Sequence, residues 1–289
     1  MNARLLPTSQ LSVRLAIGVI AVVAVLAVFG KQFAPFDPLA QHPADALAGP
    51  GFAHLFGTDY LGRDVLSRLI AGTGRSVAGA LEAVAIGLVL GVLPGLASLW
   101  MGRTIEWLLL RAVDALMTLP FIIFAVAVTG IIGNGLNEAM LAIGVLFAPM
   151  FFRITRAAAL SLTHAQYIEA AELFGASRWH VMRTHVVRKV APTIAVTAAH
   201  ATGGALLAVA SLTFLGIGVQ PPAPTWGGVL ASELGFLAQQ PWAPVIPAAL
   251  IMVTVAALNA LADGVRDAGA VTELQTAEGL EKRDDIRVA

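Results

Sequence analysis

A few ionisable side chains of this 289-residue sequence lie where they could bind or relay an ion in apolar surroundings. Asp114 and His200 each fall in a long run of apolar residues. Ionisable groups inside membrane spans are costly and often functional. His200 is expected either to line a solute pathway or to hydrogen bond between helices. Asp114 is expected to pair with Arg111, and Asp263 with Arg266. No chain of such groups is evident, so a proton relay is not favoured.

Motifs of known catalysts are absent from the sequence. It contains no G-x-x-x-x-G-K-[ST] segment, and none of its three lysines (Lys31, Lys189 and Lys282) stands in such a context. Metal-binding motifs, a nucleophile elbow and cysteines are absent as well. We therefore expect no enzyme, no P-loop ATP site and no cofactor bound by this chain. The net charge of zero gives no indication of a nucleic-acid partner.

A charged segment, Phe56–Arg68, is expected to form a loop outside the membrane. Its two glycines permit a tight turn. Asp59 and Asp64 lie close in sequence to Arg63 and Arg68, so ion pairs are expected to order the loop. The segment is either a structured loop with no ligand role, or a surface that docks a solute-binding protein or shapes an outer gate.

A second segment ends a long apolar run abruptly. Its turn-forming residues are Gly216, Gly218, Pro221 and Pro222. Irregular backbone at membrane depth is tolerated where it lines a cavity or is covered by protein. The segment is expected either to cap a pathway or simply to end a helix, and Trp226 and Trp242 suit the interfacial belt of a membrane protein.

The polar segment 153–189 interrupts the apolar sequence with six basic and two acidic residues. Tyr167–Phe174 is predicted to form a short helix that ends at Gly175, a residue suited to the left-handed conformation. Ser177 is predicted to cap a second helix, Arg178–Val190. One apolar stripe of that helix comprises Trp179, Met182, Val186 and Val190. The alternative is an ordinary amphipathic loop.

The composition predicts an all-α, polytopic membrane protein. Hydrophobic residues make up 57% of the chain, charged residues only 12%, and the mean hydropathy is +0.80. Uncharged runs of this length indicate membrane-spanning helices. Six spans are predicted at Leu15–Gly30, Val77–Met101, Ala112–Ile132, Glu138–Ile154, Pro192–Gly218 and Trp242–Ala262, with a re-entrant or interfacial piece at Trp226–Phe236. A cleaved signal peptide is the alternative for the first run.

The basic residues predict the orientation of these spans. With the N-terminus inside, 14 of the 18 Lys and Arg residues lie on the cytoplasmic side. Both termini are then cytoplasmic. The predicted parts are 1–30 (N-terminus and first span), 31–75 (external loop), 76–266 (membrane core, with the cytoplasmic loop 153–189) and 267–289 (a charged cytoplasmic tail expected to be disordered).

The segment around Glu169 resembles the Glu-Ala-Ala loop of binding-protein-dependent ABC importer permeases. The matching residues are Tyr167, Glu169, Ala170, Ala171, Gly175, Ala176, Ser177 and His185. Three further segments are similar to the dipeptide/oligopeptide/nickel (DppC/OppC-type) subfamily: Phe56–Arg68, Ala210–Pro222 continued by Pro224–Gly227, and Leu258–Asp267. The sequence departs from the family at Val187-Arg188-Lys189, where Leu-Pro-Asn is usual, although Pro192 follows.

This resemblance implies the transmembrane domain of a type I ABC importer, serving as permease subunit for peptides or related small solutes such as nickel chelates. In the family, the loop forms a coupling helix that sits in a groove of the cytoplasmic ATPase. The residues to which it assigns this coupling are Glu169, Ala170, Ala171, Gly175, Ala176, Ser177 and Arg178.

The implied partners are a second homologous permease subunit, two ABC ATPase subunits that bind ATP and Mg, an extracytoplasmic solute-binding protein, and membrane lipid. The implied location is the cytoplasmic (inner) membrane of a bacterium or archaeon. A stand-alone secondary transporter or channel is the alternative function. It would need its own ion-coupling residues and preferably an inverted repeat, and the sequence shows neither. A membrane-embedded enzyme would need a catalytic constellation, which is also not evident.

Overall fold

A computed structural model of the chain describes residues 7–163 and 165–288. Five of its helices are long and apolar enough to cross a bilayer, or six if one bent pair counts as a single span. The all-helical, polytopic fold is therefore confirmed. The elements within the spans are α1 (Pro7–Phe33), α2 (Val65–Ala97), α5 (Leu136–Thr163), α8 (Val187–Phe214) and α10 (Val245–Val288), and the bent pair is α3 (Gly102–Met117) with α4 (Phe121–Ile132).

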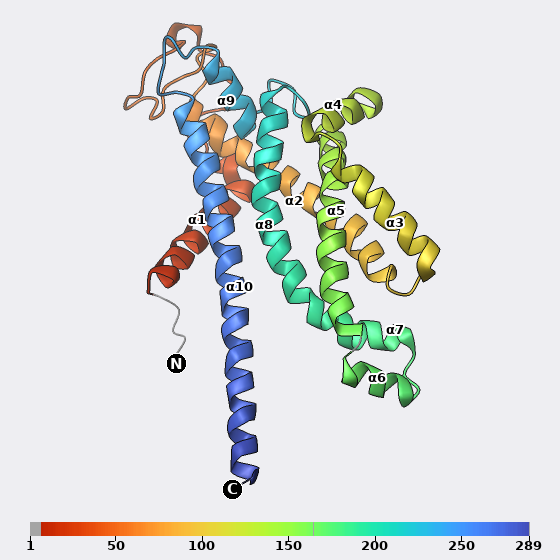
Figure 1. Cartoon of the computed structure of the whole chain (residues 1–289). Helices are drawn as coiled ribbons and strands as arrows, with labels where there is room; N and C mark the ends of the chain where they lie inside the picture. Colours follow the sequence, from red (N-terminus) through yellow and green to blue (C-terminus); the bar gives the residue numbers. More distant parts are fainter. Residues whose placement is uncertain (1–6, 164, 289) are drawn as a thin grey trace.

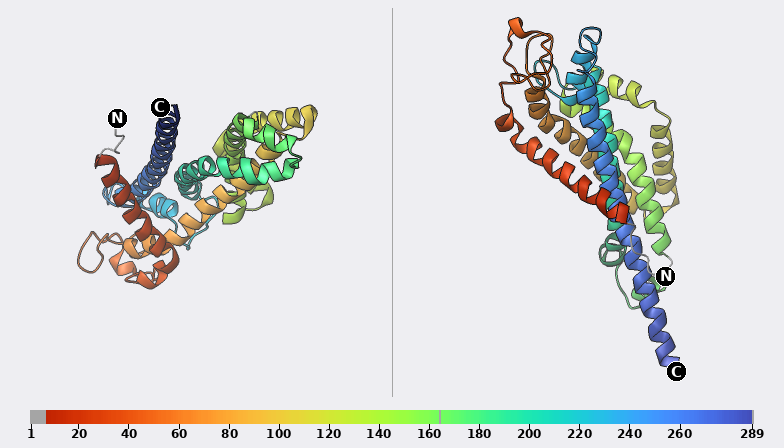
Figure 2. Two further views of the ribbon diagram at one scale, coloured as in Figure 1. Left: turned by 90° about the horizontal axis from the view of Figure 1, so that it is seen from below. Right: turned by 90° about the vertical axis from the view of Figure 1, so that its left-hand side faces the viewer.

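The long helices form an elongated bundle (Figures 1 and 2). Helix α5 packs on α2 and α8, α1 packs across α2 and α10, and α3 and α4 flank α5. At one end, here named the cap end, lie the 3-10 turn η1 (Pro43–Asp45) and α9 (Trp226–Leu234). At the opposite end, the hairpin end, lie α6 (Gln166–Leu173) and α7 (Arg178–Val181), on the same side as the start of α1 and the end of α10.

Small residues at every fourth position of α2 allow α5 to approach closely. An added Cβ at Gly91 would lie 2.5 Å from the Ala148 carbonyl oxygen, and one at Gly87 would lie 2.9 Å from the Phe147 Cβ. In membranes, helices associate largely by such close packing, because lipid supplies no hydrophobic driving force. The stripe on α2 comprises Gly79, Ala83, Gly87, Gly91 and Gly95.

Helix α2 begins at Val65, twelve residues before the span predicted to start at Val77. The Asp64 side chain accepts a hydrogen bond from the Ser67 backbone N–H at 2.7 Å and so caps the helix. The last part of the predicted external loop is therefore the first three turns of α2. We missed this start because the charged residues of these turns suggested a loop.

The predicted third span, Ala112–Ile132, is wrong as a single helix. It breaks at Thr118–Pro120 with a bend of 99° between α3 and α4. Proline disfavours a helical conformation in the preceding residue, here Leu119, and Pro120 itself has the extended backbone that precedes α4. The tail predicted to be disordered is also wrong, because α10 runs to Val288; its many Ala, Glu, Leu and Arg residues favour helix.

Candidate functional site

The hairpin of α6 and α7 projects from the bundle as the sequence predicts (Figure 1). Gly175 has φ +86°, the left-handed conformation that ends a helix without a Cβ clash. The Ser177 hydroxyl accepts a hydrogen bond from the His180 backbone N–H at 3.3 Å and caps α7. Ala170, Ala171 and Ala176 are at most partly buried. The angle between the two short helices is thus set by one glycine and one cap.

The root of the hairpin is packed into the bundle, whereas its tip is exposed. Ile168, Val181, Val186 and Val190 are buried in one cluster with Leu96 of α2 and Ala159 of α5. The apolar side chains on either side of Gly175 are instead open to solvent. Their exposed fractions are 88% for Leu173, 93% for Phe174 and 67% for Trp179, and Arg178 beside them is exposed too.

Trp179 therefore lies apart from Val186 and Val190, the buried members of the predicted apolar stripe. Only one turn of α-helix follows Ser177, and the chain then forms a π-helical turn, η2 (Met182–Val186). The wider π turn changes the phase of the helix and rotates Trp179 away from the face that Val186 and Val190 bury. The predicted break before Pro192 is also wrong, because helical structure continues from Arg178 to Phe214.

Lys189, where the sequence departs from the resembled family, ties the hairpin to α8. Its Nζ lies 4.3 Å from the centre of the Tyr167 ring, and that ring lies 5.8 Å from the ring of His185. A cation over an exposed aromatic face stabilises by about 0.5–1 kcal/mol. The departure thus supplies a contact between α6 and α8.

Replacing Lys189 with methionine keeps an unbranched side chain and removes the charge. Loss of the cation–π contact should loosen α6, so that its backbone amides exchange hydrogen about two- to fivefold faster. The measurement is hydrogen exchange of the chain in nanodiscs, with Lys189→Arg as the variant that keeps the cation. Equal exchange rates in the methionine variant and the parent would contradict a role for the contact.

At the cap end, Asp59 is the centre of a buried ion-pair cluster. Its carboxylate lies 2.7 Å from Arg63 Nε and 3.5 Å from Arg68 Nε. The same side chain accepts hydrogen bonds from the backbone N–H groups of Leu61 at 2.9 Å and Arg63 at 3.0 Å. Asp64 caps α2 and also lies 2.9 Å from His54 Nδ1. The predicted ion pairing is therefore present for Asp59, which pairs with both arginines, whereas Asp64 contacts His54 instead.

The segment Phe56–Arg68 is here named the first motif, and Ala210–Gly227 the second motif. The second motif folds onto the first at the cap end. Gly216 and Gly218 have φ +76° and +96° and end α8, with the Ile217 N–H donating back to the Leu212 carbonyl at 2.8 Å. Trp226 is buried rather than in an interfacial belt, which corrects the prediction. Its indole N–H donates to the Leu69 carbonyl of α2 at 3.1 Å. A tryptophan with a buried acceptor has no need of the membrane interface.

Side chains of both motifs line one cavity of about 280 Å³, here named the cap cavity. Tyr60, Arg63 and Arg68 come from the first motif and α2. The remaining lining residues come from the end of α8, the following turn and α9; they are Thr213, Phe214, Gly216, Val219, Pro221, Ala223, Gly228, Ala231 and Ser232. The two segments singled out separately in the sequence therefore form one structural unit.

Glu233 of α9 belongs to the same unit and was missed in the sequence. It is buried, and the loss of water around it, followed by the nearby Asp59 charge, raises the pKa of its carboxyl to about 7. Arg68 and Arg63 act in the opposite direction. The one signal in the sequence was that Glu233 is the sole charged residue of the otherwise uncharged piece Trp226–Phe236.

This pKa predicts a pH dependence of stability. The folded chain holds the Glu233 proton more tightly than the unfolded chain, whose glutamate has the ordinary value of 4.5, so stability falls as pH rises from there through about 7. The fall amounts to about 3 kcal/mol at most. Glu233→Gln should remove it, making the loss of thermal stability between pH 5 and pH 8 smaller than in the parent. Parallel losses in nanodiscs would contradict the shifted pKa.

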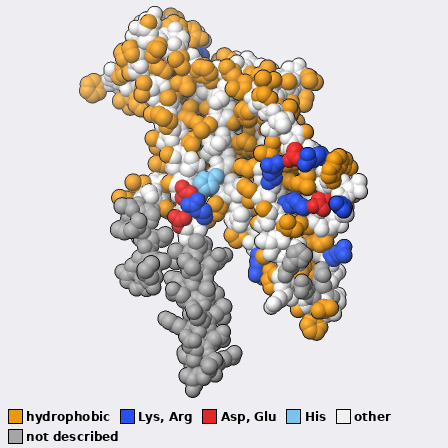
Figure 3. Space-filling view, in the orientation of Figure 1, with side chains coloured by type: hydrophobic (Ala, Val, Ile, Leu, Met, Phe, Trp, Pro, Cys, Tyr) orange, Lys and Arg blue, Asp and Glu red, His pale blue; other side chains and the backbone are white. Residues whose placement is uncertain are grey.

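Several further charged residues lie towards the hairpin end on the face shown in Figure 3. Asp114 pairs with Arg111 at 2.8 Å, as predicted, and also with Arg153 of α5 at 2.5 Å. Figure 3 shows this charged area over α3 and the adjoining end of α5. His200 Nε2 of α8 lies 3.5 Å from Asp263 of α10. This contact favours the interhelical alternative for His200.

Asp263 also pairs with Arg266 at 3.4 Å, as predicted. An ion pair at this end thus joins α3 to α5, and the contact between His200 and Asp263 joins α8 to α10.

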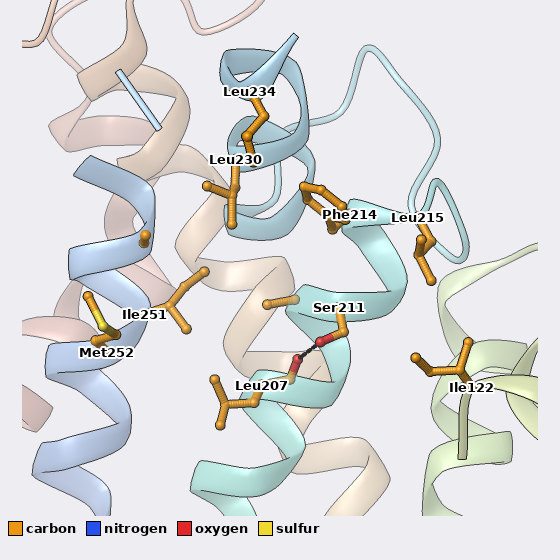
Figure 4. A pocket seen from close by; sticks show the side chains of 11 residues that line it. Ile122, Leu207, Ser211, Phe214, Leu215, Leu230, Leu234, Ile251 and Met252 are labelled. Atoms are coloured by element: carbon orange, nitrogen blue, oxygen red, sulfur yellow. Dashed lines mark hydrogen bonds between the residues drawn. The ribbon is translucent and has the colours of Figure 1, made fainter. Parts of the chain in front are cut away.

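An apolar groove of about 490 Å³ opens beside α8 towards the cap end (Figure 4). Phe214 of α8 and Leu230 and Leu234 of α9 converge on it, with Ile251 and Met252 of α10 opposite. The Ser211 hydroxyl donates to the Leu207 carbonyl at 2.8 Å, so its donor is already used. Phe214 lines both this groove and the cap cavity.

Long apolar helices with a projecting helical hairpin and a folded cap define a membrane subunit of the transport type. Residues 83–268 match the family described as binding-protein-dependent transport system inner membrane component. The chain belongs to this family. It is therefore a permease subunit of an ABC transporter in the inner membrane. The family implies separate ATPase and substrate-binding partners, and ATP and Mg belong to the ATPase.

Relatives support this over nearly the whole chain. The probable D,D-dipeptide transport system permease protein DdpC of Escherichia coli K12 is 34% identical over 91% of this chain and 88% of the relative. The di/tripeptide transport system permease protein DppC of Pseudomonas aeruginosa is 37% identical, over 84% and 82%. The glutathione transport system permease protein GsiD of Pectobacterium atrosepticum is 33% identical, over 89% and 86%.

Among solved structures, the fold is similar to a chain of the MetNI methionine ABC transporter in an inward-facing conformation. The TM-score is 0.58 at 20% identity, and the match covers 72% of this chain and 96% of that one. The predicted fold class and the prediction of a transport subunit in place of an enzyme are thereby confirmed.

Proposed function

We propose that this permease subunit imports peptides or peptide-like small solutes, and that its hairpin receives the motion of the partner ATPase. The relatives named above are permeases for dipeptides, tripeptides and glutathione. The observation that carries the coupling is the hairpin itself, with an apolar tip around Gly175 and a root buried among α2, α5 and α8. An exposed apolar patch of this kind marks a site for a protein partner.

The proposed coupling surface comprises Glu169, Ala170, Ala171, Gly175, Ala176, Ser177 and Arg178. ATP binding closes the ATPase pair and displaces the hairpin tip. Because helical structure runs without a break from Arg178 to Phe214, that displacement reaches the other end of α8. Helix α8 alone has 28 residues and is about 42 Å long. The far end of α8 borders both the apolar groove and the cap cavity. For coupling, the ATPase must bind one position of the hairpin more tightly than another.

The complete importer is proposed to contain a second homologous permease, two ATPase subunits and an extracytoplasmic solute-binding protein, surrounded by lipid. The apolar groove is a surface that the second permease can cover to complete the pathway. His200 was expected either to line this pathway or to hydrogen bond between helices, and its place in the pathway remains a proposal. The cap, with Asp59, Arg63, Asp64, Gly216, Gly218, Pro221 and Trp226, is proposed to form the outer gate and to face the binding protein.

The test of ATPase coupling is co-purification of the permease with its ATPase subunits. Phe174→Glu places a charge on the exposed tip and should abolish ATPase retention while the chain still inserts. Phe52→Glu is the matched control, because Phe52 is fully exposed in the loop between η1 and α2. Full retention of the ATPase by the Phe174 variant would exclude the tip as the docking surface.

The proposed orientation places both termini and the hairpin in the cytoplasm and the cap outside. The sequence contains no cysteine, so single introduced cysteines report position without a background signal. A cysteine at Phe52 should react with a membrane-impermeant maleimide in intact cells, and one at Leu173 should react only after the membrane is opened. The reverse pattern would contradict the orientation.

A further inference from the structure

The cap cavity presents two buried cations to a space large enough for a small chemical group. Arg63 and Arg68 line the cavity and are only 4% and 5% exposed. The volume of about 280 Å³ lies just below the roughly 300–1,000 Å³ that is common for ligand pockets. Such a space accepts the end of a small solute more readily than a protein segment.

The two guanidinium groups have donors that the described residues leave unused. Arg68 Nε is buried without a hydrogen bond to the part of the chain that the structure describes, although it lies 3.5 Å from an Asp59 oxygen. Its Nη1 makes one long contact, 3.4 Å, to the Pro38 carbonyl. Arg63 uses Nε for Asp59 at 2.7 Å. A guanidinium carries five N–H donors in a planar fork that matches a carboxylate. Arg63 and Arg68 therefore have more N–H donors than the hydrogen bonds described above use.

The charge balance of the cavity depends on Glu233. The groups that act on the Glu233 carboxyl are Asp59 and Arg63 from the loop, Arg68 from α2 and Ser232 from its own helix. Glu233 itself does not line the cavity, but Arg63, Arg68 and Ser232 do. With Glu233 ionised, two carboxylates balance two guanidinium groups. With Glu233 protonated, one positive charge remains without a counterion. His54 contacts Asp64 and does not line the cavity.

We propose that the cap cavity binds the carboxylate of a small solute on Arg63 and Arg68, and that Glu233 takes up a proton from water when it does so. The entering carboxylate replaces Glu233 as the second counterion of the arginines. Phe214 lines the cavity on one side and the apolar groove on the other, so an apolar portion of the solute can extend along it. The inference deepens the proposed function and rests on it for the source of the carboxylate.

The test measures equilibrium binding of N-acetylalanine to the full chain in nanodiscs by saturation-transfer NMR. N-acetylalaninamide is the neutral probe of the same shape, and empty nanodiscs give the background. Neither probe titrates between pH 6 and pH 8. The acid should bind and the amide should not. Apparent affinity for the acid should fall about tenfold from pH 6 to pH 8, in proportion to the fraction of chains with Glu233 protonated.

Variants separate this site from a general effect of charge. Glu233→Gln leaves the excess cation at every pH, so it should bind the acid at pH 8 as tightly as the parent does at pH 6. A gain of binding cannot arise from misfolding. Glu138→Gln and His54→Gln change residues that are not among the groups acting on Glu233, so both should retain the pH dependence of the parent. Arg68→Gln should lose binding.

Three results would overturn the proposal: no binding of N-acetylalanine at either pH, equal binding of the acid and the amide, or an unchanged pH dependence in Glu233→Gln. The test uses no ATPase. A failure to bind would therefore leave ATP-driven import standing, and a failure of ATPase co-purification would leave the carboxylate site standing.

Discussion

Gly175→Val should reduce ATP-dependent uptake at least tenfold in vesicles that contain the assembled importer, while the chain still inserts and accumulates. Gly175 has φ +86°, a conformation that costs an L-residue about 1–2 kcal/mol and a β-branched one more. Apart from Gly175 and its two chain neighbours, no heavy atom of the described chain lies within 4 Å of the position that its Cβ would take. The variant therefore acts through the backbone, by changing the angle between α6 and α7, and not through a clash.

Gly102 supplies a matched control for this prediction. It has φ +70°, and its added Cβ would likewise meet nothing within 4 Å among the described residues. It lies at the start of α3, outside the hairpin. Gly102→Val thus introduces the same strain elsewhere and should leave most uptake intact. Equal losses in the two variants would mean that strain alone impairs the permease, and normal uptake by Gly175→Val would exclude the hairpin angle from coupling.

The parts of this structure that followed from the sequence are those with local causes. Hydropathy marks a span because the bilayer demands a run of apolar residues. Five of the six predicted spans each fall largely on one long helix, although some run a few residues past one end of it. Gly175 and Ser177 mark the hairpin because a helix end and a helix cap each depend on one residue. The third span failed because hydropathy carries no information on backbone direction, and Pro120 bends a run that remains apolar throughout.

The cap cavity has no such local cause. Arg68 and Glu233 are 165 positions apart in the sequence, and they approach because Trp226 anchors the start of α9 to α2. An indole in an apolar stretch suits the membrane interface or the core equally well. The position of Trp226 in the core depends on the Leu69 carbonyl, which accepts a hydrogen bond from the indole N–H. The shift in the pKa of Glu233 depends on that docking and was therefore beyond inference from composition or spacing.

The second large effect is expected from Asp59→Asn, which should destabilise the folded chain by about 3 kcal/mol. Asp59 is fully buried and is the carboxylate nearest to both arginines. Asparagine keeps a side-chain oxygen for the backbone N–H groups of Leu61 and Arg63 but removes the charge. Asp37→Asn is the matched control, because Asp37 lies exposed in the same loop and should tolerate the change. Thermal unfolding in nanodiscs measures both variants.

Glu233 makes this loss depend on its protonation. Asp59 is one of the groups that raise the pKa of Glu233, so its removal should lower that pKa and leave Glu233 ionised at neutral pH as the remaining counterion of Arg68. Asp59→Asn should consequently be most harmful at low pH, where Glu233 is protonated and both arginines are uncompensated. The double variant with Glu233→Gln should be less stable at pH 8 than the sum of the single effects predicts. Additive effects at pH 8 would show that the two carboxylates do not share the arginines, and would remove the electrostatic basis for carboxylate binding in the cap cavity.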